Sequence, residues 1–340
     1  MPFRTRITEM LNITHPIVQG GMAHVGVAEL AAAVSNAGGL GIITGLTQPN
    51  PGALAKEIER CREMTSAPFA VNMTVFPTIN SPDYKAYCHA IIDSGVTVVE
   101  TAGTPAIAEL WKLFKAENIT IMHKCTSVRH ALSAQRKGVD IISIDGFECA
   151  GHPGEDDIPG LILVPVAADK ISIPMIASGG FADGRGLIAA LALGAEGINM
   201  GTRFCATKEA PIHDRIKQCY IDNDERGTNL IFRNLKNTAR VGKSEVSDEV
   251  VRRLSQPDAS FADVADLVNG KAGAALMKTG DINSGIYWAS MAQGLIHDIP
   301  SVQELIDRII LEAESILSHR LAGFVRTSPI SESIDRESIR

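Results

Sequence analysis

A single repeating unit limits most strongly what this chain can fold into. From Pro16 to Phe204 the sequence repeats a short apolar run rich in Val and Ile, a Gly-rich or polar turn, and a longer segment with helical periodicity. Such alternation is typical of βα units around a parallel sheet. Eight runs fit the strand pattern, and eight is the number that closes a (β/α)8 TIM barrel. The expected strands are Pro16–Gln19, Leu40–Thr44, Phe69–Met73, Val96–Glu100, Ile119–His123, Ile141–Ile144, Pro174–Ala177 and Gly197–Met200.

The segments between these runs carry helix signals of their own. Good helix formers with apolar residues at helical spacing predict helices over Val27–Asn36, Pro51–Met64, Pro105–Glu117 and Ser127–Lys137. Gly38 and Gly138 follow two of them, where a left-handed residue usually ends a helix. Both element types therefore alternate as a barrel requires.

An open dinucleotide-binding sheet is the main alternative fold. It would need G-x-G-x-x-G directly after the first strand, and the stretch from Gln19 to Gly26 does not supply that spacing. Continuous apolarity in runs such as Ile141–Ile144 suits strands covered on both sides. The closed barrel is therefore the preferred fold.

The βα rhythm stops after Phe204. Helical patterns follow over Pro211–Arg226, Ser247–Leu254, Phe261–Asn269, Ile286–His297 and Val302–His319. We expect a barrel over residues 1–206, a helical extension beside its mouth over 207–326, and a flexible polar tail over 327–340. The extension either forms a lid over the site or simply covers a barrel face.

Composition narrows the class of protein. The 340 residues are 45% hydrophobic and 21% charged, as in ordinary globular proteins, and the net charge of −7 disfavours a nucleic-acid partner. The longest apolar runs, Leu161–Ala168 and Leu187–Ala195, are too short to cross a bilayer, so we expect a cytoplasmic protein without membrane insertion. The oligomeric state stays open, a homodimer being one alternative.

The six cysteines show no C-x-x-C pair and no regular spacing. This argues against a zinc ribbon and against a disulfide framework, and reduced thiols are expected.

Reactive groups of barrel enzymes lie where strands end and in the loops that follow. Glycine-rich loops follow the last two expected strands, with Ser178, Gly179 and Gly180 in one and Gly201 and Thr202 in the other. Glycines let backbone N–H groups approach a phosphate, and a following helix N-terminus adds favourable potential. One such loop would be read as a tight turn; two neighbouring loops at this corner predict a phosphate site.

The other strand ends suggest what carries the phosphate. Gly21, Met22 and Ala23 offer backbone and a polarizable side chain to a flat ring, although Met22 could equally fill a core gap. Asn72 and Thr74 could hydrogen-bond to such a ligand. Lys124 could stabilise negative charge on a reduced flavin, or form an ion pair with Asp145 inside the barrel mouth.

His152 is the first candidate for acid–base chemistry. It lies in a long loop after the sixth strand, beside Glu155, Asp156 and Asp157, which would favour the charged imidazolium. The alternative is a surface loop in which Asp156 or Asp157 caps the next helix. A metal site from Glu148, Cys149 and His152 has an incomplete, mixed ligand set, so no metal is expected. His123 and His130 are expected to be structural.

These motifs together resemble the nitronate monooxygenases, also called 2-nitropropane dioxygenases. The resemblance runs from Pro16 to about Phe204 and more weakly to Leu321. It is carried by Pro16–Met22, Asn36–Gly41, His123–Cys125, Asp145–Pro159, Ala177–Gly186 and Asn199–Phe204. It implies an FMN-binding barrel in which His152 is catalytic. The flavin contacts that it implies are Gly21, Met22, Thr74, Lys124, Ala150, Ser178, Gly180, Gly201 and Thr202, and the adjacent Ala23, Asn72, Asp145, Gly151 and Gly179 complete the candidate set.

The resemblance leaves the substrate open. Alkyl nitronate oxidation by O2, giving a carbonyl compound and nitrite, is one hypothesis. The block around His152 also looks close to a branch known as NADH:quinone reductases, which implies NADH as co-substrate and a quinone as acceptor. An enoyl-thioester reductase is a third alternative, and it would need a broad groove for its carrier arm. A flavin-binding regulator without catalytic turnover is the alternative that is not an enzyme.

Overall fold

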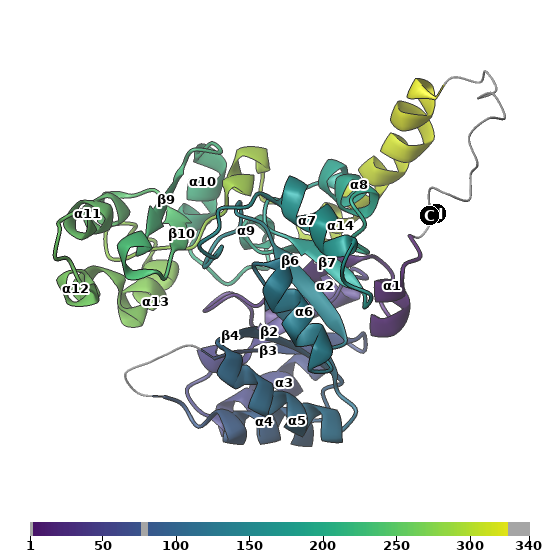
Figure 1. The fold of residues 1–340 in the computed structure, drawn as a ribbon, viewed down its shortest axis with the longest axis horizontal. Coiled ribbons are helices and arrows are strands. Elements are labelled where there is room, and N and C mark those ends of the chain that lie inside the picture. The colour runs from purple at the N-terminus through teal and green to yellow at the C-terminus, as the bar shows by residue number, and fades with distance from the viewer. Residues whose placement is uncertain (1–2, 76–80, 326–340) are drawn as a thin grey trace.

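The computed structural model describes residues 3–75 and 81–325, and shows the expected barrel (Figure 1). Eight parallel strands form one sheet in the order β1-β8-β7-β6-β5-β4-β3-β2. They are β1 (Ile17–Gln19), β2 (Gly41–Thr44), β3 (Phe69–Val75), β4 (Val98–Gly103), β5 (Thr120–Cys125), β6 (Ile141–Asp145), β7 (Met175–Ser178) and β8 (Ile198–Met200). All eight predicted strands are present, and the TIM-barrel prediction is confirmed.

Leu40 closes the barrel between β1 and β2. It pairs in parallel with Val18, its N–H donates to the Ile17 oxygen at 2.9 Å, and its own oxygen accepts from Gln19 N–H at 2.9 Å. The β1 and β2 edges of the barrel are therefore joined through Leu40, which lies just before β2.

Helices surround the sheet as the pattern predicted. They are α2 (Ala28–Asn36), α3 (Pro51–Met64), α4 (Tyr84–Asp93), α5 (Ala108–Ala116), α6 (Val128–Arg136), α7 (Gly160–Ala168) and α8 (Gly184–Ala192). One prediction was too long: Pro105–Ile107 is a 3-10 turn, and α5 begins only at Ala108.

The barrel interior is apolar at one end and polar at the other. Val18, Ile42, Ala70, Val98 and Met122 belong to one buried cluster, which α1 (Arg6–Leu11) closes from below with Ile7 and Leu11. Side chains two residues apart on a strand face the same way. The residues two positions further along therefore form the next layer: Thr44, Asn72, Glu100 and Lys124. This layer is the floor of the site.

The segment after β8 differs from the all-helical extension that was predicted. It contains α9 (Thr202–Cys205), α10 (Asp214–Asp222), α11 (Glu245–Leu254), α12 (Ala265–Val268) and α13 (Gly270–Thr279), of which α9 and α13 were not predicted. It also contains an antiparallel hairpin of β9 (Thr228–Ile231) and β10 (Ala239–Gly242). The predicted helix over Ile286–His297 is wrong, since only Met291–Leu295 forms a 3-10 turn there.

The last helix, α14 (Val302–Ser315), packs against α8 and α2 of the barrel. Gly184 permits this approach, because a Cβ there would lie 2.6 Å from the Ala313 nitrogen and the Ile309 oxygen. The chain thus adds α14 to the outer helical layer only after residues 201–301, an excursion from the barrel that lies to one side of it (Figure 1). The division at residues 206 and 326 stays a proposal, and the tail over 327–340 lies outside the described residues.

No helix within the described residues is long and apolar enough to cross a membrane. All six cysteines are free, and five of them are buried.

Candidate functional site

One cavity of about 580 Å³ opens at the carboxyl ends of the strands. All fifteen residues predicted for catalysis or cofactor binding line it. They are Gly21, Met22, Ala23, Asn72, Thr74, Lys124, Asp145, Ala150, Gly151, His152, Ser178, Gly179, Gly180, Gly201 and Thr202. The structure brings them together; the role of each remains a proposal.

Glu100 organises the floor of this cavity and was not among the predicted residues. It is fully buried, and its carboxylate accepts hydrogen bonds from Gly21 N–H at 2.9 Å, Asn72 Nδ2 at 2.7 Å and Asn199 Nδ2 at 3.1 Å. Because β4 places Glu100 in the polar layer, reading that strand's end as the others were read would have found it.

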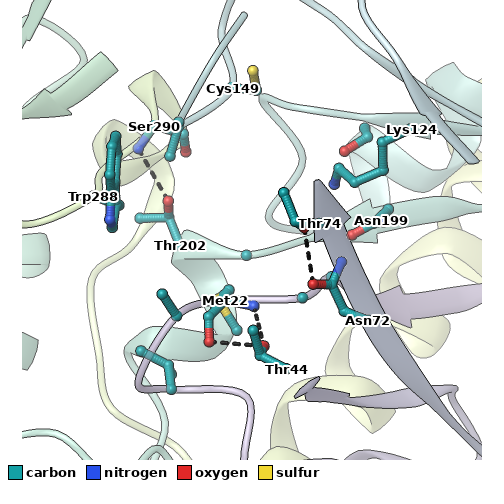
Figure 2. A pocket seen from close by; sticks show the side chains of 18 of the residues that line it. Met22, Thr44, Asn72, Thr74, Lys124, Cys149, Asn199, Thr202, Trp288 and Ser290 are labelled. Carbon is teal, nitrogen blue, oxygen red and sulfur yellow. Dashed lines mark hydrogen bonds between the residues drawn. The ribbon is translucent and has the colours of Figure 1, made fainter. Parts of the chain in front are cut away.

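Lys124 lies between two carboxylates. Its Nζ is 3.5 Å from Asp145 Oδ1 and 3.8 Å from Glu100 Oε1. Burial alone would lower the Lys124 pKa, but the attraction of Asp145 and Glu100 outweighs it, and the pKa is raised. The predicted ion pair with Asp145 therefore exists, and it keeps the ammonium charged while it faces the cavity (Figure 2).

The first strand's loop is held by Thr44. Its hydroxyl oxygen accepts from Met22 N–H at 2.8 Å and donates to the Met22 oxygen at 2.9 Å (Figure 2). Position 21, next to Met22, requires glycine, since a Cβ on Gly21 would lie 2.4 Å from Asn72 Cγ. Gly21 thus makes room for the Asn72 side chain, a reason that the sequence did not reveal.

The two glycine loops have the geometry expected for an anion. Gly179 and Gly180 have φ of +82° and +87°, which side chains rarely adopt, and neither N–H donates to an acceptor within the described residues. The Thr202 hydroxyl accepts from Ser290 N–H at 3.0 Å (Figure 2). Such loops can direct backbone donors at a phosphate.

The helix that follows these glycines contributes less than expected. The N–H of Gly184, first in α8, donates to Glu312 Oε2 at 2.7 Å, and that of Gly186 donates to Asp183 Oδ1 at 3.0 Å. Carboxylates already satisfy these donors, so the expected helix-terminus contribution is corrected in favour of the loops themselves.

His152 lies in the loop between β6 and α7, with its ring centroid 5.9 Å from that of Trp288. Burial lowers its pKa below the usual value, and Glu155 opposes this only in part. Glu155 favours the charged imidazolium, as expected, but burial outweighs it. The Glu155 carboxylate accepts hydrogen bonds from Thr238 N–H at 2.7 Å and from the Thr238 hydroxyl at 2.6 Å. The lowered pKa favours the neutral imidazole of His152.

Asp156 and Asp157 do not cap α7, whose first N–H is bound by Glu148 instead. Both Glu148 carboxylate oxygens accept from Gly160 N–H, at 3.0 and 2.9 Å, whereas Asp157 pairs with Arg233. Glu148 is thus committed to the helix, and burial raises the pKa of the Cys149 thiol. Within the described residues no group of three potential ligands could hold a metal ion.

Other histidines have packing roles. His123 Nδ1 lies 2.9 Å from Thr101 Oγ1, and its ring meets Trp111 edge-on with centroids 4.8 Å apart. His130 lies on α6 and lines a second cavity. Trp288 and Ser290, which reach the first cavity from the extension, carried no sequence signal.

That second cavity, of about 610 Å³, adjoins the first. The two share Lys124 and His152, and Gly103, Trp111 and Asn237 are among the further residues around the second. The space beside His152 is therefore larger than one cavity alone.

Comparisons with known proteins agree with this architecture. The family model described as nitronate monooxygenase matches residues 4–312. The (3aS,4S,5R,7aS)-5-hydroxy-7a-methyl-1-oxo-octahydro-1H-indene-4-carboxyl-CoA dehydrogenase of Mycobacterium tuberculosis is 30% identical over 92% of this chain and 97% of its own length. A probable nitronate monooxygenase of Staphylococcus saprophyticus is 30% identical over 94% of this chain and 100% of its own.

Solved structures show the same similarity. FabK from Thermotoga maritima matches with a TM-score of 0.85 and 33% identity, over 95% of this chain and 99% of that one. Nitroalkane oxidase from Streptomyces ansochromogenes matches with a TM-score of 0.76 and 26% identity, over 92% and 99% of the two chains. With a family model that spans nearly its whole length, this chain belongs to the nitronate monooxygenase family, as its motifs had indicated.

Proposed function

We propose that this chain is an FMN-dependent oxidoreductase that oxidises alkyl nitronates with O2 to a carbonyl compound and nitrite. Family membership supports an oxidoreductase of this type. The observation that carries the proposal is the single cavity in which glycine loops, a charged Lys124 and a neutral His152 converge.

The residues present fit FMN. The N–H groups of Gly179 and Gly180 would hold its phosphate, and the flat wall of Gly21 and Met22 would receive its ring. Asp145 Oδ1 is buried and, apart from the approach of Lys124, has no hydrogen-bond partner within the described residues. An unsatisfied buried oxygen in a cavity wall suggests that a ligand donor belongs there. When bound, FMN supplies oxidation and reduction by one or two electrons.

The chain's own residues supply charge and proton handling. Lys124 places a positive charge where negative charge would collect, with Glu100 and Asp145 holding it in position. His152, being neutral, can accept a proton or orient a substrate oxygen through a hydrogen bond.

A second function is favoured by the second cavity. A volume of about 610 Å³ beside His152 exceeds the need of a nitronate with few heavy atoms and is typical of a larger ligand. This observation supports an NADH:quinone reductase in which NADH gives electrons to the cofactor and a quinone removes them. In that case His152 would orient the nicotinamide or protonate the quinone.

Mixing without oxygen tests both functions. The purified protein is first examined for a flavin absorption spectrum, and then mixed anaerobically with alkyl nitronate or NADH. Bleaching by nitronate within the turnover time supports the first function, whereas bleaching by NADH alone replaces it with the second. In a third arm, crotonyl-type thioesters are added to the reduced flavin. Reoxidation of the flavin by these thioesters would indicate an enoyl-thioester reductase. A colourless protein that stays colourless with added FMN would overturn the proposal altogether.

A further inference from the structure

A third cavity leads outward from the proposed flavin cavity toward the extension. It measures about 540 Å³ and shares His24 and Met277 with the first. Three side chains around it can donate hydrogen bonds or carry positive charge: His24, His213 and Lys278. No carboxylate lines it among the described residues.

These three groups come from different elements that the fold fixes together. His213 precedes α10, and its N–H donates to the Met277 oxygen of α13 at 2.8 Å. Gly280, in the left-handed conformation with φ of +75°, lies against the His213 ring, because a Cβ there would be 2.3 Å from Nδ1. Lys278, in the last turn of α13, is thereby held beside His213.

The two histidines are held in defined conformations. His213 Nδ1 accepts a hydrogen bond from Arg215 N–H at 3.2 Å, which leaves the ring proton on Nε2 as a donor. His24 has φ of +64°, uncommon for a residue with a side chain, and its N–H donates to Thr47 Oγ1 at 3.1 Å. Backbone strain kept in a cavity wall often marks a binding position.

We propose that this outer cavity recognises the phosphates of a nucleotide-tailed substrate while its reacting end lies at the flavin. The shared chemistry is an adenosine diphosphate group, which occurs in NADH and in coenzyme A thioesters alike. Lys278 supplies the charge, and His24 and His213 supply directed N–H donors. The inference rests on the FMN site of the proposed function, with NADH or a coenzyme A thioester in place of the nitronate, and names that substrate class.

Each of the three side chains can be replaced by one that keeps its local structural role but removes the charge or the ring N–H. Lys278→Met keeps the stem, His213→Asn keeps a cap acceptor for α10, and His24→Asn tolerates a left-handed backbone. Lys271→Met is the matched control, because Lys271 lies on the same helix but does not line the cavity.

Calorimetry of the holoprotein with ADP, NAD⁺ and coenzyme A tests the inference. We expect Lys278→Met to weaken ADP binding about tenfold, as for loss of one charge-assisted hydrogen bond, and Lys271→Met to match wild type. In wild type the KM for reduced nicotinamide mononucleotide should exceed that for NADH, because only NADH carries the adenosine diphosphate group. This ratio of KM values should be smaller in Lys278→Met. NAD⁺ binding without coenzyme A binding identifies a nicotinamide donor, and the reverse a thioester.

ADP that fails to bind, or that binds Lys278→Met as it binds wild type, overturns the inference. Flavin content is measured in the same samples. ADP binding that depends on Lys278 in a protein that takes up no flavin would refute the proposed function and leave only the phosphate recognition by this cavity standing.

Discussion

Gly151 and Arg240 exchange two backbone hydrogen bonds: Gly151 N–H donates to the Arg240 oxygen at 3.1 Å, and Arg240 N–H donates to the Gly151 oxygen at 2.6 Å. The hairpin of the extension is thereby joined to the loop that carries His152. The Arg240 guanidinium adds a hydrogen bond to the Phe147 oxygen at 3.0 Å and lies 4.6 Å from the Phe147 ring centroid. The position of His152 therefore depends on a segment about ninety residues further along the chain (residue 240 against 152).

Replacing Arg240 with Met should disturb both stability and the His152 loop. Arg240 is buried, and the change leaves the Phe147 oxygen and the Thr228 hydroxyl without its hydrogen bonds, so we expect a loss of about 2 to 4 kcal/mol in unfolding free energy. Urea unfolding measures this. Arg233→Ala, which breaks the exposed pair with Asp157 and a contact of 5.9 Å with the Phe147 ring centroid, should cost about 1 kcal/mol. Equal losses in the two variants would contradict the special position of Arg240.

His152→Asn should keep the flavin and slow its reduction. Removing a general acid–base group costs about 10² to 10⁴ in rate, while the glycine loops remain intact. Anaerobic stopped-flow absorbance measures the rate, and His89→Asn, at an exposed position on α4, serves as control. An unchanged rate in His152→Asn would reduce the histidine to a loop residue.

Gly180→Ala should weaken flavin binding beyond its effect on the backbone. Both Gly180, with φ of +87°, and Gly138, with φ of +88°, have left-handed backbones that a Cβ strains. A Cβ on Gly180 would lie 3.2 Å from Glu148 Cβ and would shift the loop that lines the site, whereas one on Gly138 meets nothing within 4 Å. The flavin dissociation constant, from fluorescence titration, should rise only for Gly180→Ala. A similar rise in Gly138→Ala would assign the effect to strain alone.

His123 should make stability depend on pH. Burial lowers its pKa from 6.5 to about 4, with the Thr101 hydrogen bond opposing only in part. Between these values the unfolded chain binds a proton that the folded protein does not. Stability is therefore greatest above pH 6.5 and falls as the pH drops toward 4, by about 3 kcal/mol in all.

Urea midpoints of wild type and His123→Phe, compared across that pH range, isolate this contribution. The variant keeps a ring beside Trp111 and should show a shallower fall. Parallel curves would show that other groups cause the acid sensitivity.

The barrel was predictable because each strand and helix shows its hydrophobic pattern within a short stretch of sequence. Runs such as Ile141–Ile144 show continuous apolarity, and the site follows from the polar residues that end each strand. Glu100 escaped attention because the end of its strand was not searched for polar residues, although the predicted strand ended at this carboxylate; β4 itself continues to Gly103. The floor of the site was thus present in the pattern but not read from it.

The extension was less predictable because its structure depends on distant contacts. The hairpin is turned by Phe232 and Lys236, whose φ values of 62° and 52° are unusual for such residues and gave no turn signal. Its strands have four residues each, with β9 mostly half-buried and β10 buried throughout, so neither shows an alternating pattern. Trp288 reaches the cavity from an irregular segment, whose placement no local periodicity reveals.

The excursion between β8 and α14 has a consequence for how the molecule would respond to a protease. A cut within residues 255–260 would leave two polypeptides: the first holds all eight barrel strands, and the second holds α14, which packs against α8 and α2. The first piece alone would leave the α8 and α2 surfaces that α14 covers exposed to solvent. The nicked protein should therefore migrate as one particle under native conditions and separate only in denaturant.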